Sequence, residues 1–253
     1  MRRKKMKKQS LLNTRVNNVS MEEAASWILE NVRQKKTSYV VEVNTDVVMK
    51  MEKDPYLRKI ADEADLNLVD GKPLVWISRL YKRPVKEKIS GSDLVPEVIR
   101  RAAKEGVSIY ILGGTGDTPK KAAMRLKAKF PTLHIAGVYA PPWGFEKDEK
   151  ELAGINARIQ KVHPDILLAC FGCPKQEKWV YENYQKTSAT VTICAGATVD
   201  FLAGTVKRAP RWVSELGFEW FYRFLKEPGR LFRRYFVDDV QIIGLIWKYR
   251  RTR

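Results

Sequence analysis

Residues 165–177 read DILLACFGCPKQE, and this stretch decides the fold class. Its first part, 165–171, is a short apolar run of strand length, and Pro174 then opens a helix at a position where a missing N–H is tolerated. A strand that is apolar on both faces belongs inside a parallel sheet with helices on either side. The stretch therefore predicts one strand-to-helix unit of an α/β protein.

Strands and helices continue to alternate in both directions from this unit. A capping box from Ser20 to Glu23 starts the first expected helix, because each side chain can satisfy a backbone donor of the other residue. β-Branched and aromatic runs predict further strands at 38–43, 67–69, 107–112, 135–139 and 190–195. Helical periodicity predicts helices near 46–52, 55–64, 92–105 and 147–162, and another started by Thr118 and Pro119. The fold class is thus α/β, with a mostly parallel sheet covered by helices on both faces.

The composition changes after Gly204. Residues 201–253 hold 12 of the 26 aromatic residues together with 12 basic side chains, in two helical stretches separated by Pro228 and Gly229. We therefore expect three parts. They are a basic N-terminal tail at 1–12, an α/β domain at 13–204, and a basic aromatic helical C-terminal appendage at 205–253.

The net charge is strongly positive. The chain has 47 Lys and Arg against 29 Asp and Glu, and the ends 1–36 and 201–253 carry 14 of the 18 excess positive charges. Such a field favours an anionic partner. In the appendage, arginines are interleaved with aromatic side chains, which suits either an anionic lipid surface or stacked nucleic-acid bases. An amphipathic helix whose aromatics are ordinary core residues is the third reading.

Composition also disfavours several classes of protein. Three cysteines cannot form a disulfide framework, so they indicate reduced thiols and a cytoplasmic protein. The basic start is followed by no apolar stretch at 10–18, so we expect no secretion signal. The apolar run 242–247 is far shorter than the roughly 20 residues that span a bilayer, so membrane contact is expected to be peripheral.

Polar residues and glycines gather where the predicted strands end. In an open parallel sheet these ends meet at one edge, where ligands bind. The candidates are Glu42, Asn44, Asp70, Gly113, Gly114, Gln176 and Asp200. Among them Asp70 is the candidate general base, since a carboxylate followed by glycine can lie in a cleft within reach of a substrate hydroxyl. A plain Asp-Gly turn is the alternative.

Three further patterns bear on the chemistry. Gly113 and Gly114 can bring backbone amides to a phosphate, but the spacing is neither a dinucleotide fingerprint nor a Walker loop, and tight turning explains it equally well. Cys170 and Cys173 form a C-x-x-C that a helix N-terminus can activate for redox chemistry, although small buried residues are the favoured reading. The two histidines have no partner at ligand spacing, so we expect no metal and no cofactor.

Several short motifs between about Asn13 and Tyr235 carry a family resemblance. They are Ala64-Asp65-x-x-x-x-Asp70-Gly71-x-Pro73, Gly91-Ser92-Asp93-Leu94, Leu112-Gly113-Gly114, Gly172-Cys173-Pro174-Lys175-Gln176-Glu177, and Arg208-Ala209-Pro210-x-Trp212 with Gly217-Phe218-Glu219-Trp220-x-Tyr222-Arg223. In this order and spacing they resemble the WecG/TagA/CpsF family of bacterial glycosyltransferases.

The resemblance implies a Rossmann-like fold and an inverting, metal-independent transfer of a sugar from a UDP-sugar donor. The implied acceptor is an undecaprenyl-diphosphate-linked amino sugar at the inner face of the cell membrane. Typically N-acetylmannosamine is moved onto N-acetylglucosamine in cell-surface polymer synthesis. Inversion needs one base that deprotonates the acceptor hydroxyl, so a single carboxylate is enough.

By position, the resemblance also implies roles for individual residues. Asp70 matches the family's proposed base and Gln176 its motif glutamine, while Asn44 and Asp200 match positions on the nucleotide side. The appendage arginines that match those reaching a lipid diphosphate are Arg223, Arg230 and Arg233. Arginine suits a diphosphate because its planar fork donates two hydrogen bonds at once.

Two positions depart from the family pattern. Glu42 stands where a threonine is common, and Lys88 stands where an arginine is common. Both are expected to line the substrate site. A carboxylate at position 42 adds negative charge beside the donor sugar or a second candidate base, and Lys88 lacks the bidentate geometry of arginine. The donor identity therefore stays open, with another hexose or a uronic acid as alternatives.

A nucleic-acid-binding protein is the alternative from a different class. It predicts binding that weakens steeply with salt and does not depend on Asp70. The charge excess fits both readings, whereas only a glycosyltransferase explains the polar strand ends, so we expect no nucleic-acid partner. The sequence leaves a homo-oligomer open.

Overall fold

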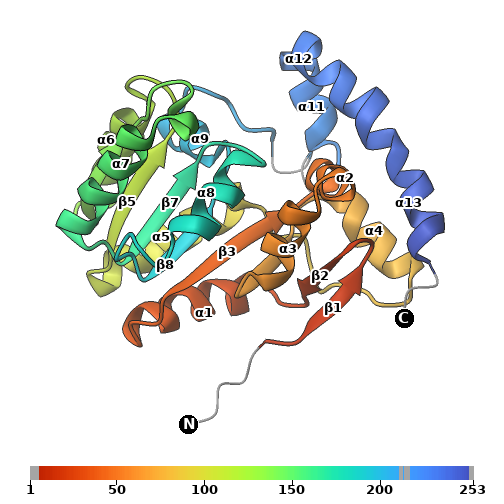
Figure 1. Cartoon of the computed structure of the whole chain (residues 1–253), viewed down its shortest axis with the longest axis horizontal. Helices are drawn as coiled ribbons and strands as arrows, with labels where there is room; N and C mark the ends of the chain where they lie inside the picture. The colour runs from red at the N-terminus through yellow and green to blue at the C-terminus, as the bar shows by residue number, and fades with distance from the viewer. Residues whose placement is uncertain (1–5, 211–212, 214–216, 251–253) are drawn as a thin grey trace.

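The structure is a computed structural model that describes residues 6–210, 213 and 217–250, without the side chains of residues 219, 223, 230 and 234. A parallel six-stranded sheet lies at its centre in the order β4-β3-β8-β7-β5-β6, and a separate antiparallel pair, β1-β2, packs beside β4 (Figure 1). The strands are β1 (Lys8–Leu11), β2 (Thr14–Asn17), β3 (Ser38–Val43), β4 (Leu66–Val69), β5 (Ser108–Gly113), β6 (His134–Tyr139), β7 (Ile166–Cys170) and β8 (Val191–Cys194).

Most of the remaining described chain is helical. The helices of the α/β part are α1 (Met21–Arg33), α2 (Thr45–Lys53), α3 (Pro55–Glu63), α4 (Lys72–Leu80), α5 (Gly91–Glu105), α6 (Thr118–Lys129), the short η1 (Phe145–Lys147), α7 (Glu149–Val162), α8 (Lys175–Asn183) and α9 (Thr198–Ala203). After them come α11 (Glu219–Lys226), α12 (Pro228–Arg233), η2 (Arg234–Asp238), η3 (Asp239–Gln241) and α13 (Ile242–Tyr249).

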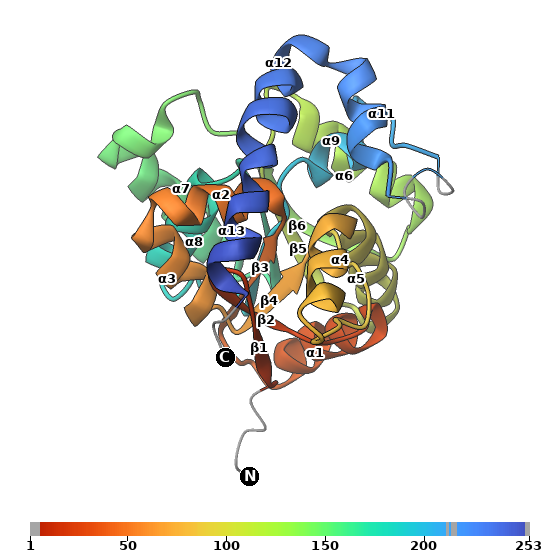
Figure 2. The ribbon, with the colours of Figure 1, turned by 90° about the vertical axis from the view of Figure 1, so that its right-hand side faces the viewer.

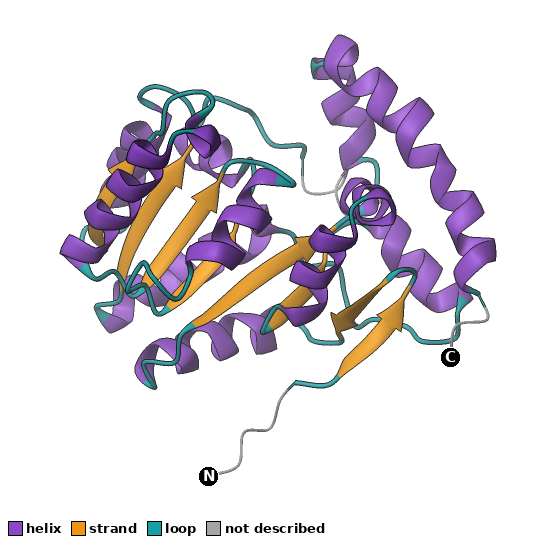
Figure 3. Cartoon of the chain, in the orientation of Figure 1, coloured by secondary structure: helices purple, strands orange, loops and turns teal. Residues whose placement is uncertain are grey.

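Helices cover both faces of the sheet (Figure 3). One buried apolar cluster joins the sheet to α2, α3, α7 and α8, and a second joins the opposite face to α1, α5, α6 and α9. The side chains of β3 show why both faces are covered, because they point alternately to the two sides of the sheet and are apolar on each. Val41 and Val43 belong to the first cluster and Val40 to the second. This confirms the predicted α/β class with a mostly parallel sheet.

The predicted capping box starts α1. The Ser20 hydroxyl accepts the Glu23 backbone N–H at 3.1 Å, and the Glu23 carboxylate accepts the Ser20 backbone N–H at 2.7 Å. Two donors that the first turn leaves without helical partners are thereby satisfied. The helix begins at Met21, directly after the cap.

The N-terminal hairpin β1-β2 was not predicted. We expected residues 1–12 to form a tail, but residues 8–11 pair with β2, and Leu11 and Leu12 are buried in the first apolar cluster. Two strands of four residues with polar side chains give too short a pattern to be recognised in the sequence. A contact with a distant part of the chain anchors them, since the Asn17 side-chain amide oxygen accepts the Asn67 backbone N–H at 2.8 Å.

The segment after Gly204 is helical, as predicted, and its last helix packs against the α/β part. α13 lies beside α2, with Ile242 and Leu245 buried in the first apolar cluster (Figure 2). The Tyr81 hydroxyl, at the end of α4, donates to the carbonyl oxygen of Ile246 at 2.8 Å. The treatment of residues 205–253 as a unit of its own stays an interpretation.

The end of β5 gives a test of the packing. Gly113 has a φ of 118°, and a Cβ added there would lie 2.4 Å from the carbonyl oxygen of Cys170 on β7. Because backbone cannot swing aside, we expect Gly113→Ala to lower the free energy of unfolding by about 3 kcal/mol. Gly116 has a φ of 52° with open space around it, so Gly116→Ala should cost only about 1 kcal/mol. Urea unfolding measures both, and equal losses would contradict the role of the close approach.

Candidate active site

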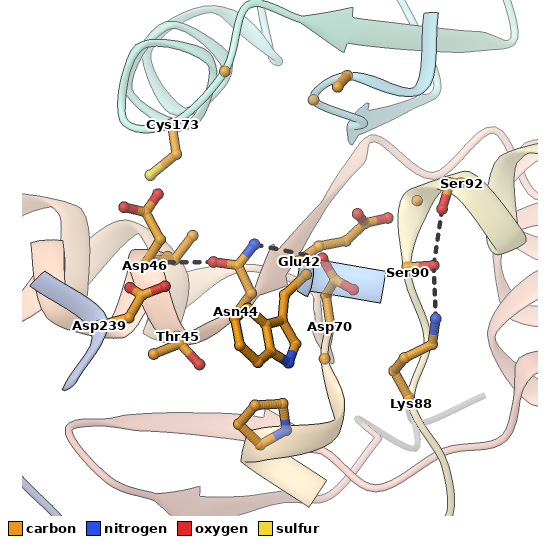
Figure 4. A pocket seen from close by; sticks show the side chains of 18 of the residues that line it. Glu42, Asn44, Thr45, Asp46, Asp70, Lys88, Ser90, Ser92, Cys173 and Asp239 are labelled. Carbon is orange, nitrogen blue, oxygen red and sulfur yellow. Dashed lines mark hydrogen bonds between the residues drawn. The ribbon is translucent and has the colours of Figure 1, made fainter. Parts of the chain in front are cut away.

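A cavity of about 660 Å³ opens where β3, β4, β7 and β8 end. The first turns of α2, α4, α5 and α8 line it as well, so several helix N-termini converge on one space. The predicted site residues that line it are Glu42, Asn44, Asp70, Lys88 and Gln176 (Figure 4). The carboxyl edge of the parallel sheet thus brings together side chains that are far apart in the sequence.

Asn44 and Asp70 are neighbours because β3 and β4 pair in parallel. The Asp70 backbone N–H donates to the carbonyl oxygen of Val43 at 2.8 Å, which extends the ladder one residue past the end of β4. The Asn44 amide nitrogen then donates to the Asp70 carboxylate at 3.4 Å (Figure 4). The Asn44 amide oxygen accepts the Val47 backbone N–H at 3.1 Å and so caps α2. This cap fixes the amide with its donor side toward Asp70.

The two readings of Asp70 are both represented in the structure. Gly71 follows with a φ of 114° and precedes the first turn of α4, so the Asp-Gly pair does form a strand-to-helix junction. The Asp70 side chain nevertheless lines the cavity. A carboxylate that lines a cavity is placed to accept a proton from a bound hydroxyl.

Gln176 ties two of the loops together. Its side-chain oxygen accepts the backbone N–H of Gly172 at 3.2 Å and that of Gly196 at 3.0 Å, so it joins the loops that follow β7 and β8. Its amide nitrogen donates to Glu177 at 2.8 Å. Burial raises the pKa of Glu177, which Gln176 partly offsets. Gln176 therefore shapes the wall of the cavity, whatever it contacts in a substrate.

Lys88 belongs to a network that the sequence did not reveal. Its ammonium donates to the Asp93 carboxylate at 3.0 Å and to the Ser90 hydroxyl at 3.4 Å. Arg208, from the segment after α9, also pairs with Asp93 and donates to the carbonyl oxygen of Ser92 at 3.0 Å. Burial raises the pKa of Asp93, but the Ser90 hydrogen bond, Lys88 and Arg208 together lower it to about 2. The network fastens the chain after α9 to the start of α5.

Three residues that were predicted to bind the nucleotide-sugar donor are absent from the described lining of the cavity: Gly113, Gly114 and Asp200. The Gly114 backbone N–H donates to the carbonyl oxygen of Cys170 at 3.1 Å, which is the geometry of the tight strand-to-helix turn that we weighed as the alternative. Asp200 lies in the first turn of α9, with its carbonyl oxygen accepting the Thr205 N–H. Their roles toward a nucleotide stay predictions.

The C-terminal segment closes part of the cavity. Trp220 and Tyr235 line it and meet edge to face, with ring centroids 5.6 Å apart. The other lining residues of this segment are Gly217, Phe236, Asp239, Val240 and Ile242. Sequence reasoning placed this segment at a membrane but did not predict that it forms a wall. Of the predicted diphosphate ligands, Arg233 is exposed away from the cavity lining, and the side chains of Arg223 and Arg230 lie outside the described part.

The sequence matches the Glycosyl transferase WecG/TagA/CpsF family over residues 9–253. The chain belongs to this family. It is therefore a glycosyltransferase, and the family motifs that follow β4 and β7 line the cavity.

Two relatives of the chain carry the same descriptive name, N-acetylglucosaminyldiphosphoundecaprenol N-acetyl-beta-D-mannosaminyltransferase. The one from Bacillus spizizenii (strain ATCC 23059 / NRRL B-14472 / W23) is 28% identical over 197 residues, which cover 78% of this chain and 74% of the relative. The one from Bacillus subtilis (strain 168) is 29% identical over 199 residues, covering 79% and 75%.

No described helix is both long enough and apolar enough to cross a bilayer. Within the same ranges, no group of three or more His, Cys, Asp or Glu side chains is arranged to hold a metal ion. Metal-independent transfer stays a prediction for the assay described below.

The thiols give a test of the redox alternative. Burial raises the pKa of Cys170 to about 12 and raises the pKa of Cys173 further, so both thiols are protonated near neutral pH. Since the thiolate is the reactive form, we expect alkylation by iodoacetamide at pH 7.5 to be roughly 100-fold slower in the folded protein than in urea. Mass spectrometry of the time course counts the modified sites. A rapidly labelled Cys173 would restore the redox reading.

Proposed function

We propose that the protein transfers a sugar, in the first instance N-acetylmannosamine, from a UDP-sugar to N-acetylglucosamine carried on a polyprenyl diphosphate. The transfer inverts the anomeric carbon and needs no metal. The observation that carries the proposal is the Asp70 carboxylate in the lining of the cavity, oriented by Asn44. The names of the two Bacillus relatives support the choice of sugar and acceptor.

Asp70 is the base in this mechanism. Its carboxylate takes the proton from the acceptor hydroxyl as that oxygen attacks the anomeric carbon of the donor. The new carbon–oxygen bond forms on the face opposite the leaving group, and the bond from the anomeric carbon to UDP breaks with both electrons going to the diphosphate. The products are UDP and a glycoside whose anomeric configuration is opposite to that of the donor. The Asn44 hydrogen bond holds the carboxylate in position for that step.

Backbone donors are the proposed partners of the departing diphosphate. α2, α4, α5 and α8 begin at the cavity, and helix N-termini carry partial positive charge and N–H groups without helical partners. A cavity of about 660 Å³ is of the size that holds a nucleotide sugar. In this proposal the nucleotide extends toward Asp200 and the Gly113-Gly114 turn, which the family resemblance assigns to the donor.

The C-terminal segment is the proposed contact with the inner face of the cell membrane. It contributes a wall to the cavity, so a lipid-linked acceptor held there would reach Asp70 directly. Its basic side chains suit anionic headgroups and the acceptor diphosphate. Its exposed apolar side chains include Phe218, Phe221, Leu225, Phe232, Val237, Ile243 and Trp247.

Replacement of the base tests the mechanism. Asp70→Asn keeps the size of the side chain but cannot accept a proton, so we expect turnover to fall about 10²- to 10⁴-fold while UDP still binds. The assay measures UDP release from UDP-N-acetylmannosamine with a short-chain lipid-diphosphate acceptor in the presence of EDTA. Asp117→Asn, whose side chain is 69% exposed on the surface, is the matched control and should stay active.

Two results of this assay would contradict the proposal. Normal turnover by Asp70→Asn would show that Asp70 is not the base. A wild-type enzyme that is inactive in EDTA and recovers with a divalent cation would contradict transfer without metal.

Replacement of the appendage arginines tests the membrane contact. We expect Arg223→Ala, Arg230→Ala and Arg233→Ala in combination to reduce flotation with anionic vesicles and to lower kcat/KM for the lipid acceptor about tenfold or more, while KM for the donor stays unchanged. The control removes three exposed arginines from the α/β part, Arg33, Arg58 and Arg100, and changes the net charge equally. If both variants float equally poorly, net charge alone governs binding. If the protein shifts nucleic acid in a gel but does not float with vesicles, the result favours a nucleic-acid-binding protein.

A further inference from the structure

Glu42 is a half-buried acid, with a buried carboxyl oxygen, in an otherwise buried strand. The other five residues of β3 are buried, and Glu42 shares a strand face with Val40, which packs in the apolar cluster under α1, α5 and α9. A Cβ on Gly91 would lie only 2.6 and 2.9 Å from the two carboxyl oxygens of Glu42, so the glycine leaves the space that this side chain fills. The carboxyl group lines the cavity beside Asp70 (Figure 4).

One oxygen of the Glu42 carboxyl group is available for a hydrogen bond to a ligand. Its Oε1 is buried and has no hydrogen-bond partner among the described residues. A buried polar atom without a partner is costly, and a ligand in the cavity is the group that can supply one. The position therefore points to substrate rather than to a role within the fold.

The surroundings of Glu42 favour its neutral form. Burial raises its pKa well above the usual value, and the negative charges of Asp70, Glu177 and Asp93 add to this, against an opposing hydrogen bond from the Gly91 backbone N–H. These groups come from the end of β4, from α8 and from α5. The remaining titratable neighbours are the thiols of Cys170 and Cys194 on β7 and β8, and Lys88, which pairs with Asp93.

We infer that Glu42 acts as a neutral carboxylic acid that donates its O–H to an oxygen of the donor sugar, and that it selects an uncharged N-acetylhexosamine over a uronic acid. This inference rests on the proposed glycosyl transfer and specifies its donor. Asp70 stays ionised as the base, and Glu42 gives up no proton during the reaction. The two adjacent acids thus hold different protonation states, as pairs of interacting carboxyl groups do.

The charge balance of the cavity supports the exclusion of uronic acids. The carboxyl-bearing residues that line it are Glu42, Asp46, Asp70, Glu177 and Asp239, and the lining lysines are Lys50, Lys72 and Lys88. Lys50 pairs with Asp46 at 2.8 Å and Lys88 with Asp93 at 3.0 Å. A sugar carboxylate beside the ionised Asp70 would add a like charge where the dielectric constant is low. An acetamido or hydroxyl oxygen would instead satisfy the neutral acid.

The test compares two variants and two donors. Glu42→Gln keeps the shape and a hydrogen-bond donor, whereas Glu42→Met keeps the length and removes the donor. The donors are UDP-N-acetylmannosamine and the same nucleotide sugar with C6 oxidised to a carboxylate. UDP release with the lipid-diphosphate acceptor gives kcat/KM from pH 6 to 9.5, and thermal melting over the same range reports whether each variant folds.

Four outcomes are expected. Wild-type enzyme uses the uncharged donor at least tenfold better than the uronic acid. Glu42→Gln stays within about threefold of wild type, while Glu42→Met loses about 10- to 100-fold in kcat/KM, as expected for one hydrogen bond to substrate. Wild-type kcat/KM falls at alkaline pH as Glu42 ionises, and Glu42→Gln lacks this decline. Since the folded-state pKa is raised, wild type also loses stability as the pH rises through it, and Glu42→Gln loses less.

Three results would overturn the inference. A wild-type enzyme that prefers the uronic acid removes the selectivity. If Glu42→Gln is as inactive as Asp70→Asn, Glu42 acts as a second base and not as a neutral donor. Glu42→Met that is folded and equal to Glu42→Gln removes the contact with substrate. If wild type releases no UDP with any acceptor, the proposed transfer fails by itself, and the donor preference is then measured from the thermal shift that each UDP-sugar produces.

Discussion

The site depends on the parallel pairing of β3 with β4 on one side and β8 on the other. Parallel strands end at the same edge, so the residue that follows each strand is delivered to one place whatever its position in the chain. Asn44 and Asp70, 26 residues apart, come within hydrogen-bond distance for this reason alone. The loop after β8 brings Gly196 to the same edge, where Gln176 fastens it. A shift in the β3–β4 register would carry the Asp70 carboxylate away from Asn44 and out of the cavity.

Burial gives that edge its chemistry. Parallel strands must be apolar on both faces, so any acid set among them loses hydration and tends toward its neutral form. Glu42 on β3 follows this rule, and burial has the same effect on Glu177 on α8, whereas Asp93 on α5 is held ionised by Ser90, Lys88 and Arg208. The C-terminal segment adds an aromatic wall over the same space. A transferase gains from such closure, because water excluded from the cavity cannot replace the acceptor hydroxyl.

The local features of the fold were predictable from the sequence, and the long-range ones were not. Apolar runs and the Ser20 cap located strands and α1 because each signal lies within a few residues. The strand ends likewise predicted that Asp70 lies at the edge of the sheet, where it lines the cavity. The Arg208–Asp93 pair joins residues 115 apart, and no local pattern announces it. The β1-β2 hairpin escaped prediction since its strands are short and polar. Family membership was predicted from the order and spacing of several motifs, because no single motif is specific enough to indicate it.

The central claim is that Asp70 meets the acceptor hydroxyl inside this cavity. A crystal structure of the protein with UDP and a short-chain lipid-diphosphate acceptor would test it most directly. The account predicts UDP at the helix N-termini around the cavity and the attacking sugar hydroxyl about 3 Å from the Asp70 carboxylate. UDP bound elsewhere, or an acceptor hydroxyl nearest to another acid, would contradict it.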